Sequence, residues 1–126
     1  MTTPREAVIA AFSKEFASLA TLFHLSERSL ASSYSAGENT DRPGVYVHWC
    51  AGEVLRIGRS LSNARTRALE HIRDDTGKRM AALKQNSDAW LLLFTVQSPS
   101  HLHWVVALEV FLESALKPSI PSKRAG

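Results

Sequence analysis

The sequence predicts a mixed α/β (α+β) fold in which helices flank a small three-stranded antiparallel sheet. Two short runs of alternating apolar and polar residues, 44–50 and 54–58, are separated by three residues, which is typical of a β-hairpin. A third run, 90–96, is apolar on both faces and short, as expected of a buried central strand. Apolar residues at helical spacing precede, separate and follow these runs, so helices are expected around the sheet.

The composition is that of one globular domain. The 126 residues suffice for a single core, and 44% hydrophobic and 21% charged residues are ordinary proportions. No apolar run is long enough to span a membrane, and Glu6, Lys14 and Glu15 interrupt the apolar residues that a secretory signal would need. A single cysteine, Cys50, excludes an internal disulfide and fits a reducing compartment. We therefore expect a cytoplasmic protein without a membrane partner.

The first part of the chain is predicted to be helical. Apolar residues recur at helical spacing over 4–23, with Pro4 in the first turn, and Ser26 is placed to cap a second short helix through Tyr34. Residues 37–43 are turn-rich and indicate a linker. These features predict an N-terminal helical extension at 1–40, a core domain at 41–118 and a flexible tail at 119–126. The N-terminal helices are also the predicted surface for a homodimer or a protein partner.

The polar face of the predicted hairpin gathers residues that are uncommon in a core. Alternation along the first strand points Tyr46 and His48 to one face and the apolar residues to the other. With three residues in the loop, His48 pairs with Arg56 and Tyr46 with Gly58. The same register predicts the remaining neighbours, which are Cys50 with Val54 and, on the apolar face, Val47 and Trp49 with Ile57 and Leu55. Tyr46, His48 and Arg56 then share a face that suits phosphodiester chemistry.

The elements after the hairpin are predicted in the same way. Ser60 or Ser62 is expected to cap a helix that runs to about Asp74. Later elements are a polar helix at 76–85, the buried strand at 90–96 and a last helix at 101–116.

Basic residues concentrate in one segment of the chain. Residues 54–84 contain eight lysines and arginines but three acidic residues, whereas the whole chain has a net charge of +3. Such a patch favours a polyanionic partner such as DNA or RNA. The alternative is a solvated helix face without a binding role.

The order hairpin, helix, buried strand, helix resembles the GIY-YIG nuclease family. Gly44-Val45-Tyr46 and Arg56-Ile57-Gly58 carry the resemblance, which extends from Gly44 to Pro118. The family has a Gly-hydrophobic-Tyr strand, a Tyr-hydrophobic-Gly strand, an arginine four residues before a histidine or tyrosine, and a glutamate on the last helix. The resemblance implies a metal-dependent endonuclease that hydrolyses phosphodiester bonds in DNA with Mg²⁺ or Mn²⁺, and leaves RNA open as a substrate.

The resemblance also implies roles for individual residues. Tyr46 would relay or accept the proton of the attacking water, and Arg67 would hold the scissile phosphate. His71 would position Tyr46 or the water, or assist proton transfer. Glu109 would bind the metal, with Glu113 as the alternative ligand. Further contacts to nucleic acid are expected from His48, Arg59, Arg65 and Lys78.

Structural roles compete with these assignments. Tyr46 could be an ordinary strand tyrosine, and His71 could belong to the surface of an amphipathic helix. Glu109 lies in an apolar helix, where it could instead pair with an arginine. Arg67 could instead form a surface ion pair with Glu70 or Asp74.

Two positions depart from the family pattern. Arg56 stands where the family has its second tyrosine, and an arginine cannot act as a base. Pro121 stands where the family has an asparagine after the last helix, and its side chain donates no hydrogen bond. These departures motivate a second hypothesis, a catalytically inactive nucleic-acid-binding module on the same fold.

Overall fold

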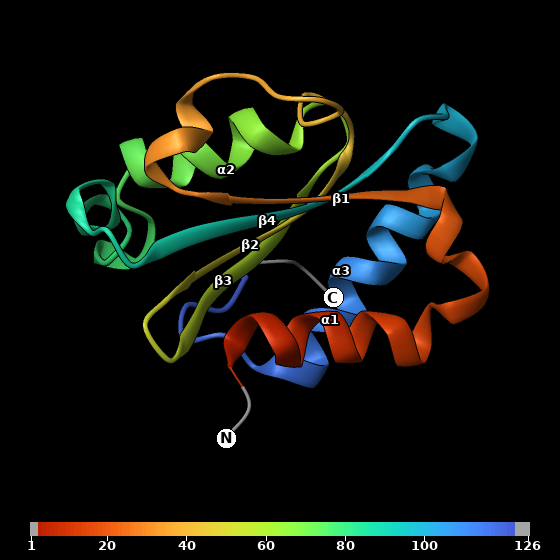
Figure 1. Ribbon diagram of the computed structural model, residues 1–126, viewed down its shortest axis with the longest axis horizontal. Helices are drawn as coiled ribbons and strands as arrows, with labels where there is room; N and C mark the ends of the chain where they lie inside the picture. Colours follow the sequence, from red (N-terminus) through yellow and green to blue (C-terminus); the bar gives the residue numbers. More distant parts are fainter. Residues whose placement is uncertain (1–2, 123–126) are drawn as a thin grey trace.

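The computed structural model describes residues 3–122, which form a four-stranded antiparallel sheet with helices on both faces. The strands are β1 Phe23–Ser29, β2 Gly44–Cys50, β3 Glu53–Ser60 and β4 Ala89–Val96, in the order β1-β4-β2-β3. The helices are α1 Pro4–Glu15, α2 Ala64–Arg73 and α3 Leu102–Leu116. Short 3₁₀ helices connect them: η1 Ala17–Leu22, η2 Ala31–Tyr34, η3 Thr76–Lys78, η4 Ala81–Gln85 and η5 Pro99–His101. Helix α2 covers one face of the sheet, and α1 and α3 cover the other (Figure 1).

The main core lies between the sheet and the pair α1 and α3. Alternation along β2 turns Val45, Val47 and Trp49 toward this side, as the sequence predicted. The two helices contribute buried side chains to the same core: Val8, Phe12 and Phe16 from the N-terminal segment, and Val105, Leu108 and Leu112 from α3. The apolar face of α1 is therefore used within the chain.

The sheet has four strands rather than the three predicted, because part of the predicted N-terminal helices is strand β1. The predicted helices at 4–23 and 26–34 are wrong at residue 23 and over 26–29, which belong to β1. This strand pairs with β4 from Phe23 opposite Val96 to Ser29 opposite Trp90. Serine, glutamate and arginine favour strands weakly, so nothing local indicates β1. Pairing with the exposed edge of β4 satisfies the backbone hydrogen bonds of the segment and outweighs its local preference.

The hairpin register is confirmed at the end away from the turn and wrong at the turn. Tyr46 lies opposite Gly58 and His48 opposite Arg56, as predicted. An irregularity after His48 then pairs Trp49 with Val54 and Cys50 with Glu53, instead of Cys50 with Val54. This bulge turns Leu55 to the same face as Arg56, where it joins a second core with Ile72 and Met80.

The other elements follow the predictions with local corrections. Helix α2 is capped by Asn63 rather than by Ser60 or Ser62. The predicted helix at 76–85 is two 3₁₀ helices, because Asp75 and Gly77 have positive φ angles of 51° and 70°. Between residues 3 and 122, no helix is both long and apolar enough to cross a membrane.

The segment after α3 packs against β3. Ser119 donates its backbone N–H to the Val54 carbonyl at 3.1 Å, and Ile120 donates to the Leu55 carbonyl at 2.8 Å. The Ile120 side chain is buried in the second core. The tail at 119–126 was predicted to be flexible, but residues 119–122 are packed against the domain. The remainder of the predicted tail, 123–126, lies outside the described residues.

Candidate active site

An open pocket of about 230 Å³ lies at the β3 edge of the sheet, between residues of α2 and α3. It is lined by Tyr46, Arg56, Gly58, Arg59, Arg67, Glu109 and Ser122. Five residues were predicted to be catalytic, and four of them, Tyr46, Arg56, Arg67 and Glu109, line this pocket. The fifth, His71, contacts both Tyr46 and Arg56.

Tyr46 and His71 form a buried hydrogen-bonded pair. The Tyr46 hydroxyl lies 2.7 Å from Nε2 of His71, and Nδ1 of His71 lies 2.8 Å from Oγ1 of Thr76. Arg56 donates through Nε to the same Nε2 at 3.4 Å. Because an arginine N–H can only donate, Nε2 is the unprotonated nitrogen and accepts from the Tyr46 hydroxyl, while Nδ1–H donates to Thr76. The imidazole lone pair is thus aimed at the phenolic proton.

Burial keeps both members of this pair neutral in the free protein. Burial, together with the positive charges of Arg56 and Arg67, lowers the pKa of His71 to about 4. Burial also raises the pKa of Tyr46, and this effect outweighs the opposing attraction of Arg56 and Arg67. At neutral pH the site therefore contains a phenol and a neutral imidazole.

Buried neutral histidines make the protein sensitive to mild acid. Burial lowers the pKa of His48 to about 3, and that of His71 is about 4, against 6.5 for an unperturbed histidine. Below pH 6.5 the unfolded chain binds protons that the folded chain does not, so stability is full above this pH and is lost toward pH 4. We expect the free energy of unfolding in urea to fall by up to about 1.4 kcal/mol per pH unit for each histidine. His71→Gln should remove about half of the slope, and a constant free energy between pH 7 and pH 4.5 would contradict the assignment.

Glu109 pairs with Arg59 inside the pocket. Nη1 of Arg59 lies 2.6 Å from Oε1 of Glu109, and the two side chains are 31% and 3% exposed. The competing structural role of Glu109 is therefore present in the free protein. The carboxylate nevertheless lines the pocket.

The donor set fits a hydrated Mg²⁺ or Mn²⁺ better than a fully protein-enclosed ion. Among residues 3–122, no three His, Cys, Asp or Glu side chains are grouped as metal ligands. Mg²⁺ is commonly held by one or two carboxylates together with waters and substrate phosphates. Glu109 lines the pocket, whereas Glu113 accepts the backbone N–H of Ser122 at 3.0 Å and does not line the pocket.

Arg67 extends from α2 into the pocket lining and forms a weak ion pair at the surface. Its Nη1 donates to Oε1 of Glu70 at 2.7 Å, three residues along the helix, and the side chains are 46% and 32% exposed. Such pairs contribute less than about 1 kcal/mol, so a phosphate can replace Glu70 as the partner. The predicted pairing with Glu70 thus does not remove Arg67 from the site.

The residues predicted to contact nucleic acid separate in the structure. Arg59 lies in the pocket, but His48 is fully buried and bonded through Nε2 to the Ala68 carbonyl at 3.1 Å, so the prediction for His48 is wrong. Arg65 binds both carboxylate oxygens of Asp41 and joins α2 to the preceding loop. Lys78 is exposed beside a different hollow that includes Cys50 and Leu83.

The two departures from the family pattern contact each other. Nη1 of Arg56 donates to the backbone carbonyl of Pro121 at 3.4 Å, and the neighbouring Ser122 lines the pocket. Sequence reasoning identified both positions as departures but could not pair them. The contact uses a backbone carbonyl, which every residue type offers, so the sequence carries no signal for it.

Gly58 leaves the space that Tyr46 occupies. A Cβ at position 58 would lie 2.3 Å from the Tyr46 hydroxyl oxygen and 2.5 Å from its ring carbon Cζ. We expect Gly58→Ala to displace the ring from His71 and to destabilise the protein by about 1–3 kcal/mol. Gly52→Ala is the matched control, because a Cβ there meets nothing within 4 Å. Equal urea midpoints for the two variants would show that Gly58 is not needed for this packing.

Comparison of the chain with family models, with curated protein sequences and with solved structures finds no match.

Proposed function

We propose that the chain is a metal-dependent endonuclease that hydrolyses phosphodiester bonds in DNA. The observation that carries this proposal is the convergence of Tyr46, Arg59, Arg67 and Glu109 on one pocket, with His71 behind the tyrosine. Phosphodiester hydrolysis needs a group to remove a proton from water, cations to bind the phosphate and stabilisation of the developing charge. Each need has a candidate residue in this pocket.

The Tyr46 and His71 pair is suited to proton relay. A water in the pocket transfers a proton to the Tyr46 oxygen while the phenolic proton passes to Nε2 of His71, and the resulting hydroxide attacks phosphorus. The P–O bond to the leaving strand end breaks, and the leaving oxygen takes a proton from solvent water. His71 becomes an imidazolium whose Nδ1–H remains bonded to Thr76. Arg56 and Arg67 disfavour this cation in the free protein. The negative charge of a bound phosphate opposes their effect, so the relay becomes favourable only when substrate is present.

The remaining pocket residues bind the phosphate and the cofactor. Arg67 and Arg59 donate hydrogen bonds to the phosphate oxygens. To do so, each arginine gives up its present carboxylate partner. Glu109 would hold Mg²⁺ or Mn²⁺ in place of Arg59. The ion would supply Lewis-acid stabilisation of the charge that develops on the phosphate.

One observation favours a second function, nucleic-acid binding without cleavage. Arg56 donates to the same Nε2 that must accept the phenolic proton, so it opposes the relay more strongly than a tyrosine would. In that case the basic pocket would bind DNA or RNA in a salt-dependent manner and leave it intact.

A cleavage assay distinguishes the two functions. Labelled single-stranded DNA, double-stranded DNA and RNA are incubated with the purified protein in Mg²⁺, in Mn²⁺ or in EDTA. If the protein is an endonuclease, we expect it to cleave DNA in Mg²⁺ or Mn²⁺ but not in EDTA. Salt-dependent binding with no product, even in Mn²⁺ after long incubation, supports the binding module. If the protein neither binds nor cleaves nucleic acid, both functions are rejected.

A further inference from the structure

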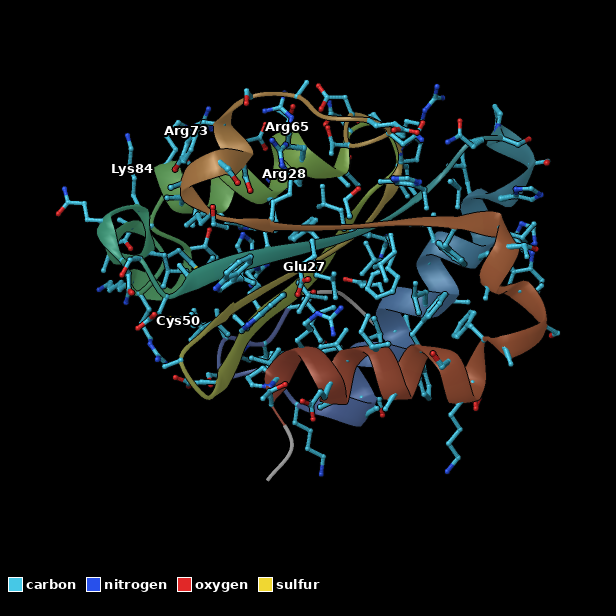
Figure 2. All side chains as sticks on the ribbon, in the orientation of Figure 1. Glu27, Arg28, Cys50, Arg65, Arg73 and Lys84 are labelled. Carbon is cyan, nitrogen blue, oxygen red and sulfur yellow. The ribbon has the colours of Figure 1, made fainter. Side chains whose placement is uncertain are left out.

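A second and larger pocket, of about 530 Å³, lies on the outer side of α2. Its walls come from η2, α2 and η4, and it is lined by Tyr34, Leu69, Glu70, Ile72, Arg73, Ala81 and Lys84. Figure 2 labels Arg73 and Lys84 close to each other, on the side of the sheet that α2 covers. Arg73 and Lys84 belong to the basic segment 54–84, but the sequence assigned none of these residues to a site.

The two pockets meet at one ion pair on α2. Arg67 lines the candidate active site, Glu70 lines the second pocket, and the two side chains are bonded at 2.7 Å. They lie three residues apart, which is less than one turn of the helix. A polynucleotide held by Arg67 therefore needs to extend by only a short distance to enter the second pocket.

The second pocket combines the groups that a nucleotide needs. The Tyr34 ring is 45% exposed, and leucine, isoleucine and alanine side chains supply apolar surface beside it. Nζ of Lys84 lies 5.5 Å from the centre of the Tyr34 ring, and between residues 3 and 122 no carboxylate forms an ion pair with it. Arg73 pairs with Asp74, and both side chains are more than half exposed. A base can stack on the ring while its phosphate replaces these weak partners of the cations.

We propose that this pocket binds an unpaired nucleotide that flanks the scissile phosphate. The inference rests on the proposed function, because the polynucleotide enters through the candidate active site. Stacking requires a base whose faces are free, so the pocket selects single-stranded extensions over fully paired DNA. Phosphate binding by Lys84 adds affinity for either kind of strand.

Binding is measured in EDTA by the fluorescence anisotropy of a blunt duplex and of the same duplex with a single-stranded extension. We expect Tyr34→Ala to weaken binding of the extended duplex by about 5-fold to 150-fold, as for loss of one stacked base. Tyr34→Phe keeps the ring and should bind as the wild type does. Binding of the blunt duplex should be unchanged by either substitution. Tyr34 is half-exposed, so both variants should fold, which circular dichroism verifies.

Charge is tested with a matched pair of lysines. Lys84→Gln should weaken binding and lower the dependence of log K on log salt by about 0.7–0.9, as expected for one lost phosphate contact. Lys14 is exposed on α1, which covers the opposite face of the sheet (Figure 1). Lys14→Gln removes the same charge and should leave binding unchanged.

The outcomes distinguish failure of the second-pocket inference from failure of the proposed function. If the wild type binds no nucleic acid, the proposed function and this inference both fail. If the wild type binds or cleaves DNA while Tyr34→Ala and Lys84→Gln bind the extended duplex as it does, the second pocket is rejected and the proposed function stands. Loss of affinity in Tyr34→Phe equal to that in Tyr34→Ala would reject stacking as the mode of binding.

Discussion

Replacing Tyr46 by phenylalanine is expected to slow phosphodiester cleavage by about 100-fold or more, the usual contribution of a positioned proton acceptor. The change removes the hydroxyl that lies 2.7 Å from Nε2 of His71 and leaves the ring in place beside Gly58. One hydrogen bond is lost, so the free energy of unfolding should fall by only about 1 kcal/mol. Single-turnover cleavage of a labelled duplex in Mg²⁺ measures the rate, and urea unfolding measures the stability.

Tyr34→Phe is the matched control for this experiment, because it removes the hydroxyl of an exposed tyrosine outside the candidate active site. It should cleave as the wild type does. Wild-type cleavage by Tyr46→Phe would remove the tyrosine from the reaction. In that case His71 would have to act on water directly, and His71→Gln would be the more damaging substitution.

Replacing Glu109 by glutamine is expected to abolish metal binding and to reduce cleavage by about 100-fold or more. Glutamine keeps the shape of the side chain and an oxygen that can accept from Arg59, but not the negative charge that attracts a divalent ion. Titration calorimetry with Mn²⁺ measures binding without a need for turnover. A plasmid-nicking assay measures cleavage.

Glu113→Gln provides the control one helical turn away, where the carboxylate accepts the Ser122 N–H. It should bind Mn²⁺ and nick plasmid as the wild type does. Full activity of Glu109→Gln would falsify the metal assignment, and loss of Mn²⁺ binding in Glu113→Gln alone would transfer it to Glu113.

Local patterns were sufficient for the elements that hold most of the site. Alternation predicted the register that places Tyr46 opposite Gly58 and His48 opposite Arg56, and helical spacing put Arg67 and His71 on one helix. Such patterns are readable because strands and helices repeat every 2.0 and 3.6 residues. Polarity alone did not distinguish a pocket residue from a buried one: His48 is polar and lies on the same strand face as Tyr46, yet it is sealed against Ala68.

The site itself depends on contacts between distant parts of the chain. Arg59 and Glu109 are fifty residues apart, and Arg56 reaches a backbone carbonyl at Pro121, so no local pattern predicts either contact. The same holds for β1, whose weak strand preference is outweighed by hydrogen bonds to β4.

Residue periodicity in the sequence was thus enough to predict the hairpin, α2, β4 and α3 and to nominate most of the pocket residues. The partners of those residues, the fourth strand and the packing of 119–122 were decided by the folded structure. The physical reason is that periodicity reports only which side of an element a residue faces. Hydrogen bonds, ion pairs and pKa values depend on which elements that side meets.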